Sequence, residues 1–142
     1  MNAYLHDALR GALPTHFVPT ADVPWVASGT PGKRSKLLRT FAHGFVELLH
    51  MEPGVVMPLH RHTGEVHVYQ LSGRRQLCTG EVIGPGDYVH EPAGNVDWWK
   101  VIGDEPMLAL VVVAGEVEFI GPDGAVRGVA NAATQARAAA GR

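Results

Sequence analysis

The sequence is poor in cysteine, in charge and in long apolar runs, and each shortage excludes a class of protein. Cys78 is the single cysteine, so no intrachain disulfide can form, and a reducing compartment such as the cytoplasm is expected. Twelve basic against fourteen acidic residues give a net charge of −2, which leaves no basic surface for a row of nucleic-acid phosphates. The longest apolar run, residues 107–114, is far shorter than the roughly 18 residues that a membrane helix needs. We therefore expect a small-molecule partner, and neither nucleic acid nor a membrane.

Two further features are missing from the chain. The N-terminal residues contain Asp7 and Arg10 and no long apolar stretch, so we expect no signal peptide. The glycines occur in turn pairs and form no glycine-rich run that enters a helix, which argues against a phosphate-binding loop. What remains is a chain of 142 residues, 46% hydrophobic, which is enough for one domain with one core.

Glycine and proline recur at short intervals through the middle of the chain, and they leave room for strands rather than helices. Asp123-Gly124 is a hairpin signal. Many short strands separated by turns predict an all-β protein, an antiparallel β-barrel or jelly roll made of two sheets. The expected strands cover residues 45–51, 55–62, 66–71, 76–79, 88–91, 96–102, 107–113 and 117–120.

The two ends of the sequence differ from this middle part. Residues 1–34 are expected to form an arm, with a short helix as one option for residues 2–13, because prolines and glycines interrupt the rest. Residues 35–129 form the predicted β domain. Residues 130–142 are rich in alanine and lack large apolar side chains, so we expect a loose tail or a frayed helix with nothing to anchor it.

His60-Arg61-His62 is the sharpest chemical feature. Residues two apart in a strand point to the same face, about 6–7 Å apart along the chain, which suits two neighbouring ligands of one metal ion. The alternative is a pair of surface histidines on an exposed strand.

The surroundings of this pair resemble the two sequence motifs of the cupin superfamily. The first motif is Gly54, five residues, His60, one residue and His62; the second is Gly86, five residues, Pro92-Ala93-Gly94 and two further residues. The resemblance covers residues 54 to about 101. It implies a small antiparallel jelly-roll barrel with a metal ion inside, held by residues of both motifs.

Two positions depart from the cupin pattern. The glutamate of the first motif is absent, or shifted to Glu65, or replaced by His67. Asp97 stands where the second motif has its histidine. If Asp97 is a ligand, then His60, His62 and Asp97 form the two-histidine, one-carboxylate set that binds non-haem Fe(II) with open positions; otherwise Asp97 is a turn residue.

Within the cupins, the sequence resembles small proteins around acetylacetone-cleaving dioxygenase, 2,4'-dihydroxyacetophenone dioxygenase and the ChrR-type cupin domains. The resemblance implies an Fe(II) dioxygenase that acts on a small diketone or hydroxyaryl ketone, and a homodimer; Zn, Mn or Ni are alternative metals. It also implies that Glu91 lies beside the metal, with Arg74 or Arg75 paired to it. The alternatives are an O2-independent isomerase, cyclase or decarboxylase that works through an enolate, and a ligand-sensing cupin without turnover.

For several other side chains the sequence allows either a functional role or a role in packing. His67 is expected to line the pocket as an acid–base group beside Glu91, or else to face outward. His90 is expected outside. One of Trp98 and Trp99 should face the interior, as a ligand wall or in core packing. Cys78 is expected to be a small buried residue.

Overall fold

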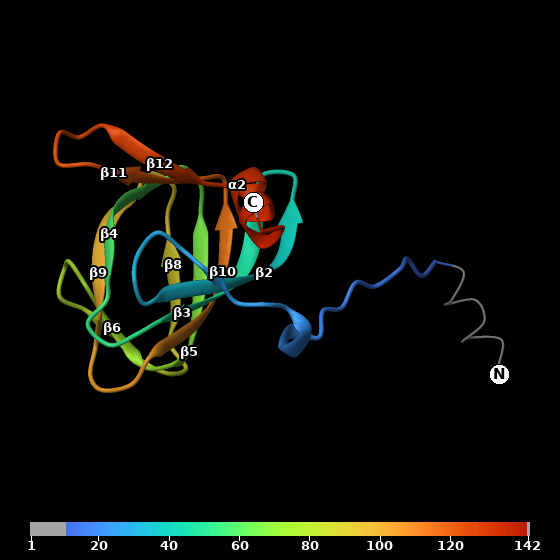
Figure 1. Ribbon diagram of the computed structural model, residues 1–142, viewed down its shortest axis with the longest axis horizontal. Coiled ribbons are helices and arrows are strands. Elements are labelled where there is room, and N and C mark those ends of the chain that lie inside the picture. Colours follow the sequence, from blue (N-terminus) through green and yellow to red (C-terminus); the bar gives the residue numbers. More distant parts are fainter. Residues whose placement is uncertain (1–10, 142) are drawn as a thin grey trace.

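Two antiparallel sheets of six strands each face one another in the computed structural model, which describes residues 11–141 (Figure 1). The all-β prediction is confirmed, and the arrangement is a jelly-roll sandwich rather than a closed barrel. Each sheet keeps two edge strands, which a closed barrel would have paired with one another.

The first sheet, sheet A, has the strand order β1-β2-β3-β10-β5-β8. Its strands are β1 (Val26–Ala27), β2 (Lys33–Phe41), β3 (Gly44–Met51), β5 (Val66–Ser72), β8 (Tyr88–Glu91) and β10 (Met107–Ala114). The strands predicted from the sequence include neither β1 nor β2. Four basic residues in β2 obscure its alternation, and the strand is defined by its antiparallel pairing with β3.

The second sheet, sheet B, has the order β12-β11-β4-β9-β6-β7. Its strands are β4 (Val56–His62), β6 (Arg74–Leu77), β7 (Val82–Ile83), β9 (Val96–Ile102), β11 (Val117–Ile120) and β12 (Val126–Ala130). The predicted strands over residues 96–102 and 117–120 agree with β9 and β11. The Asp123-Gly124 turn joins β11 to β12, as expected.

The core lies between the two sheets and follows the alternation of each strand. In β10 every second residue is buried, beginning with Met107 and Ala109, and Trp99 and Val101 of β9 face them from sheet B. The side chains between these face outward and are half-buried or exposed. The facing inner surfaces therefore enclose the space in which a site can form.

The chain passes from sheet A to sheet B at Gly73, between β5 and β6. Gly73 has φ +69°, and a Cβ atom there would lie 2.3 Å from the carbonyl oxygen of Pro106. Only glycine combines this backbone conformation with so close an approach. The buried Gln70 supports the crossing, because its Nε2 donates to the carbonyl oxygens of Ser72 and Gly73.

Residues 132–139 form an α-helix, α2 (Ala132–Ala139), which was one of the two forms expected, but the expectation that nothing anchors it is wrong. The Asn131 side chain caps the helix by accepting from the Thr134 backbone N–H, and the Thr134 hydroxyl accepts from the Asn131 N–H. Gln135 then donates from Nε2 to Oε2 of Glu47 on β3 over 2.9 Å. Polar contacts, rather than large apolar side chains, hold this helix against sheet A.

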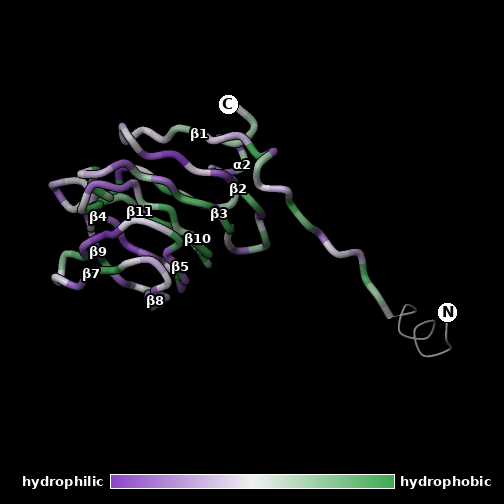
Figure 2. The backbone as a smooth tube through the Cα atoms, turned by 90° about the horizontal axis from the view of Figure 1, so that it is seen from below, coloured by the Kyte–Doolittle hydropathy of each residue, from purple (hydrophilic) through white to green (hydrophobic). Residues whose placement is uncertain are grey.

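The described part of the N-terminal segment begins as an exposed stretch that leads away from the sandwich (Figure 2). It contains a short 3-10 helix, η1 (Thr20–Asp22), and the Thr20 carbonyl oxygen accepts from Lys36 Nζ of β2 over 2.7 Å. Most of the helix considered for residues 2–13 lies outside the described residues. The division into 1–34, 35–129 and 130–142 stays a prediction. Across residues 11–141, the helices fall short of the length and apolarity that a membrane crossing requires.

A core substitution on β9 tests the sandwich. Val101 is fully buried and Val96, on the same strand, is 48% exposed. We expect Val101→Ala to lower the free energy of unfolding by about 2 kcal/mol through lost burial and a residual cavity. The matched Val96→Ala should change it by less than about 0.5 kcal/mol. Urea unfolding measures both, and equal effects would contradict the packing described.

Candidate metal centre and cavity

A β-bulge in β4 turns the two motif histidines toward the core. The pairing of β4 with β9 shifts between Met57, opposite Trp99, and His60, opposite Asp97, so β4 carries one extra residue. Met57, His60 and His62 are consequently all buried, while Pro58 and Leu59 between them are exposed. Strict alternation from Met57 would have turned both histidines outward, so the bulge aims them inward.

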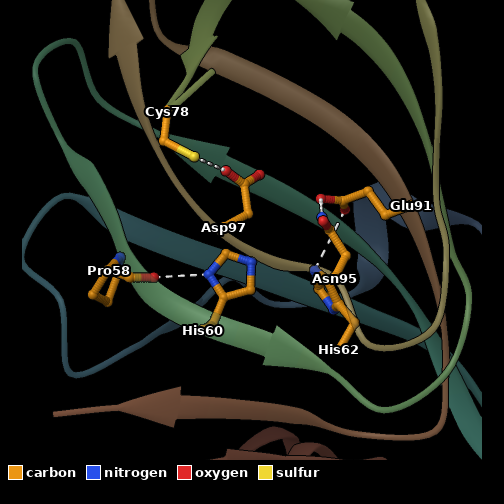
Figure 3. A network of polar contacts seen from close by, with 7 residues as sticks. All are labelled: Pro58, His60, His62, Cys78, Glu91, Asn95 and Asp97. Atoms are coloured by element: carbon orange, nitrogen blue, oxygen red, sulfur yellow. Dashed lines mark hydrogen bonds and ion pairs between the residues drawn. The ribbon is translucent and has the colours of Figure 1, made fainter. Parts of the chain in front are cut away.

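The backbone at the bulge also fixes the tautomer of His60. Its Nδ1 lies 2.7 Å from the carbonyl oxygen of Pro58 (Figure 3). A carbonyl oxygen can only accept, so Nδ1 carries the proton and donates it. Burial lowers the pKa of His60, which favours the neutral ring. Nε2 of His60 is then left with a lone pair, as a metal ligand requires.

His62 lies beside His60 and next to a carboxylate. The ring centres of the two histidines are 4.7 Å apart, and Nε2 of His62 is 3.4 Å from Oε2 of Glu91 on β8. Neither ring nitrogen of the buried His62 has a well-formed hydrogen bond. Asn95 Nδ2 donates to Oε1 of Glu91 over 3.2 Å (Figure 3). The His62 ring is thus held close to Glu91 with its donor atoms still available.

Glu91 is a buried carboxylate among cationic or ionisable neighbours. Burial by itself raises the pKa of Glu91, but the adjacent His62, together with Arg75 and His60, outweighs it and the pKa falls below its usual value. Glu91 is therefore ionised at neutral pH. It can accept a proton, a hydrogen bond or a metal ion.

Arg75 on β6 is the arginine that approaches Glu91, and Arg74 is exposed. The Arg75 side chain is 2% exposed, and its guanidinium carbon lies 4.7 Å from the ring centre of Trp99. Burial lowers the pKa of Arg75, while the charges of Glu91 and Asp97 oppose that shift. Its Nε and Nη2 have no hydrogen-bond partner within the described chain. These buried donors are free to meet an oxygen of a bound molecule.

Asp97 shares the inner face of sheet B with its cross-strand neighbour His60 and is buried. Its Oδ1 accepts a hydrogen bond from the Cys78 thiol, 3.0 Å away, which turns the carboxylate aside (Figure 3). The donor atoms of His60, His62 and Asp97 accordingly do not all lie within 4.8 Å of one another. Cys78 is exposed rather than buried as expected, because the chain leaves the sheet directly after Leu77.

The inward histidines open onto a cavity of about 340 Å³ between the two sheets. Its walls are mainly apolar and come from both sheets; Phe45, Val68, Trp99, Met107, Val111 and Phe119 are among them. Trp99, not Trp98, is the tryptophan that faces the interior. His60, His62, Glu91 and Arg75 supply the polar groups at one part of this cavity. Apolar walls with a few converging polar groups are typical of a small-molecule site.

His67 lies outside this cavity, so the prediction that it lines the pocket is wrong. It alternates with the buried Val66 and Val68 on β5 and therefore occupies the outer face of sheet A. There its Nδ1 contacts the Tyr88 hydroxyl. Tyr69, two residues further along β5, lies on the same outer face and is exposed.

A second set of metal-ligand residues occurs on that outer face. Glu65, His67 and His90 bring one donor atom each within 4.8 Å of one another, and no other such group of three exists among residues 11–141. Oε1 of Glu65 is 2.8 Å from Nε2 of His90, which is exposed as expected. These three side chains could hold a metal ion at the surface.

Two charged residues of the cavity, Lys33 and Glu47, were not predicted from the sequence. Glu47 carried a readable signal: in the predicted strand over residues 45–51 it alternates with Phe45 and Leu49 and so shares their buried face. Lys33 lies in β2, which was not predicted as a strand, so its buried face could not be read from the sequence.

A jelly roll with inward histidines and buried carboxylates around an apolar cavity defines a cupin. The chain belongs to the family described as the ChrR cupin-like domain, whose pattern matches residues 14–118. No functionally curated protein matches it.

Solved structures share this fold. An RmlC-like cupin from Ralstonia eutropha is 24% identical, with a TM-score of 0.84 over 91% of this chain and 87% of its own. An acetylacetone dioxygenase from Acinetobacter johnsonii is 14% identical, with a TM-score of 0.78 over 92% and 93%. The polyketide cyclase RemF from Streptomyces resistomycificus is 20% identical, with a TM-score of 0.63 over 83% and 85%.

Proposed function

We propose that this protein is a metal-dependent cupin enzyme that acts on a small carbonyl compound. The observation that carries the proposal is the pair of buried imidazoles at the bulge: His60 donates its Nδ1 proton to the Pro58 carbonyl oxygen, and His62 has no well-formed hydrogen bond at either nitrogen, with Glu91 3.4 Å from its Nε2. Buried histidine nitrogens without partners are costly unless a ligand or metal meets them. His60 and His62 would hold the metal, with Asp97 as the third ligand.

A divalent metal at this site would supply a Lewis acid for a carbonyl oxygen and, as Fe(II), a centre for O2 chemistry. The remaining tasks, proton transfer and substrate binding, fall to side chains of the protein. Glu91, ionised and held by Asn95, accepts a proton from the carbon next to the carbonyl. Arg75 offers its unpartnered N–H groups to the substrate oxygens, and the apolar walls keep water out.

The reaction proposed is a dioxygenation with Fe(II), of a diketone or a hydroxyaryl ketone. The fold shared with an acetylacetone dioxygenase supports it. An O2-independent cyclase or isomerase is the second candidate, and the fold shared with a polyketide cyclase supports that one. Both need the same buried imidazoles and the same proton acceptor.

The histidine pair is tested by metal content. We expect His60→Ala and His62→Ala each to weaken metal binding more than the roughly 10- to 100-fold that is typical of losing an outer-shell partner. The matched control is His67→Ala with His90→Ala on the outer face, which should leave the interior metal in place. Metal stoichiometry by elemental analysis after dialysis gives the result. Loss of metal only in the outer-face variants would transfer the proposed site to Glu65, His67 and His90.

Single substitutions separate the two buried carboxylates. Asp97→Ala should lose metal, because the third donor, the single anionic one of the set, disappears, while Cys78→Ala should retain it, because the carboxylate is released from its thiol. Glu91→Gln should retain metal and lower turnover by about 100-fold or more, the range of a lost proton acceptor. Metal content and steady-state rates are measured on the same preparations. The reverse pattern would make Glu91 the ligand.

Oxygen uptake decides between the two reaction classes. Protein loaded with Fe(II) should consume O2 in step with acetylacetone or a hydroxyaryl ketone in an oxygen electrode, and protein loaded with Zn(II) should consume none. Substrate loss without O2 uptake, at equal rates with both metals, would select the O2-independent class instead.

A further inference from the structure

A second group of polar side chains lies in the same cavity, away from the histidines. Lys33 and Ser35 come from the inner face of β2, Glu47 from the inner face of β3, and Gln135 from helix α2. None of them belongs to a cupin motif or to the metal set proposed above. Their placement gives an otherwise apolar cavity two polar regions.

Lys33 is the member with unused hydrogen-bonding capacity. Its Nζ lies 3.9 Å from Sδ of Met57, a weak acceptor, and 5.4 Å from the ring centre of Phe119. No carboxylate within the described chain forms an ion pair with it at 4.0 Å or less. Burial lowers the pKa of Lys33, and the charge of Glu47 opposes that shift.

The ring of Phe119 lies near both Lys33 and His60, one of the proposed metal ligands. Phe119 on β11 is the cross-strand neighbour of His60, and their ring centres are 6.1 Å apart. Lys33 Nζ approaches the same Phe119 ring. A molecule with one end at His60 and a body along Phe119 would therefore bring its other end to Lys33.

Glu47 is already occupied by protein donors. It accepts from Gln135 Nε2 over 2.9 Å and from the Ser35 side chain. Burial raises the pKa of Glu47, and the charge of Lys33 partly counters the effect. Glu47 therefore lies near Lys33 without using up its N–H groups.

Filling the cavity changes the situation of Lys33. A neutral ligand that displaces water from the cavity would leave an ammonium group buried without an acceptor, which is unfavourable. A ligand that ends in an anionic oxygen would supply the missing acceptor in an apolar setting, where such a hydrogen bond is strong. The cavity thus favours an anion at the Lys33 end.

We propose that Lys33 binds an anionic oxygen of the substrate, so that the substrate is a ketone whose far end carries a carboxylate or a phenolate. This inference rests on the proposed function, because it takes the carbonyl end to lie at His60 and His62. It narrows the substrate class from any small ketone to an acidic one.

The test is a pair of ligands of equal shape and different charge, 4-acetylbenzoate and 4-acetylbenzamide, titrated calorimetrically into metal-free and Zn(II)-loaded protein. We expect the benzoate to bind about tenfold more tightly or better. Lys33→Met should remove this preference and leave the affinity for the amide unchanged. Lys33→Arg should retain the preference.

The matched control is Lys36→Met, a change of the same residue type on the same strand. Lys36 donates to the Thr20 carbonyl and lies near Trp25, outside the cavity, so the preference for benzoate should persist. Equal affinities of the two ligands for the parent protein, or equal losses of both in Lys33→Met, would overturn the inference.

The metal proposal and this inference can fail separately. If His60→Ala and His62→Ala leave the metal content unchanged, the proposed metal site is wrong. The preference for benzoate in metal-free protein, lost in Lys33→Met, would still establish the anion site. Conversely, a metal centre at the histidines with no charge preference would reject the anion site alone.

Discussion

The one-residue bulge in β4 is the constraint on which the interior chemistry depends. Without it, the alternation that buries Met57 would expose His60 and His62. The extra residue lets β4 bury Met57 in the apolar wall and still turn both imidazoles inward. The same bulge presents the Pro58 carbonyl to His60 and so selects the tautomer. The backbone at the bulge thus orients the His60 ring and also leaves its Nε2 with a free lone pair.

The two sheets contribute different groups to the cavity, and the sandwich brings them together. Sheet B supplies His60, His62, Asp97 and Arg75, and sheet A supplies Glu91, Glu47 and Lys33. Each polar region combines a basic with an acidic side chain: Arg75 lies near Glu91 and Asp97, and Lys33 lies near Glu47. Such a cavity can hold charged side chains because each has a counter-charge nearby, yet Arg75 and Lys33 retain donors for a ligand.

The family motifs and the local geometry support the same site from separate directions. The motif pattern selects His60 and His62 from eight histidines. The structure shows those two buried and facing the cavity, whereas His67 and His90 lie on the outer face. Asp97 occupies the motif position and yet its carboxylate bonds to Cys78. That hydrogen bond is weak, since a thiol is a poor donor, so it leaves the carboxylate able to turn.

The sequence by itself determined where most strands lie. Glycine and proline terminate them, and β-rich runs fill the intervals, so β9 and β11 were predicted with their full bounds. The i, i+2 spacing also determined that His60 and His62 share a face. Period-2 spacing is local, however, and it does not say which face is buried. His67 was misplaced for this reason.

Tertiary structure decided what local spacing leaves open. The bulge exists only in the register between β4 and β9, two strands far apart in sequence. Helix α2 has no large apolar side chains to signal its docking, and the contact of Gln135 with Glu47, 88 residues away in the chain, helps to hold it. Lys33 joins the cavity because β2 pairs with β3, a partnership that its basic composition conceals. Each of these outcomes depends on contacts between distant segments, which no local pattern contains, because burial is a property of the packed sandwich and not of a single strand.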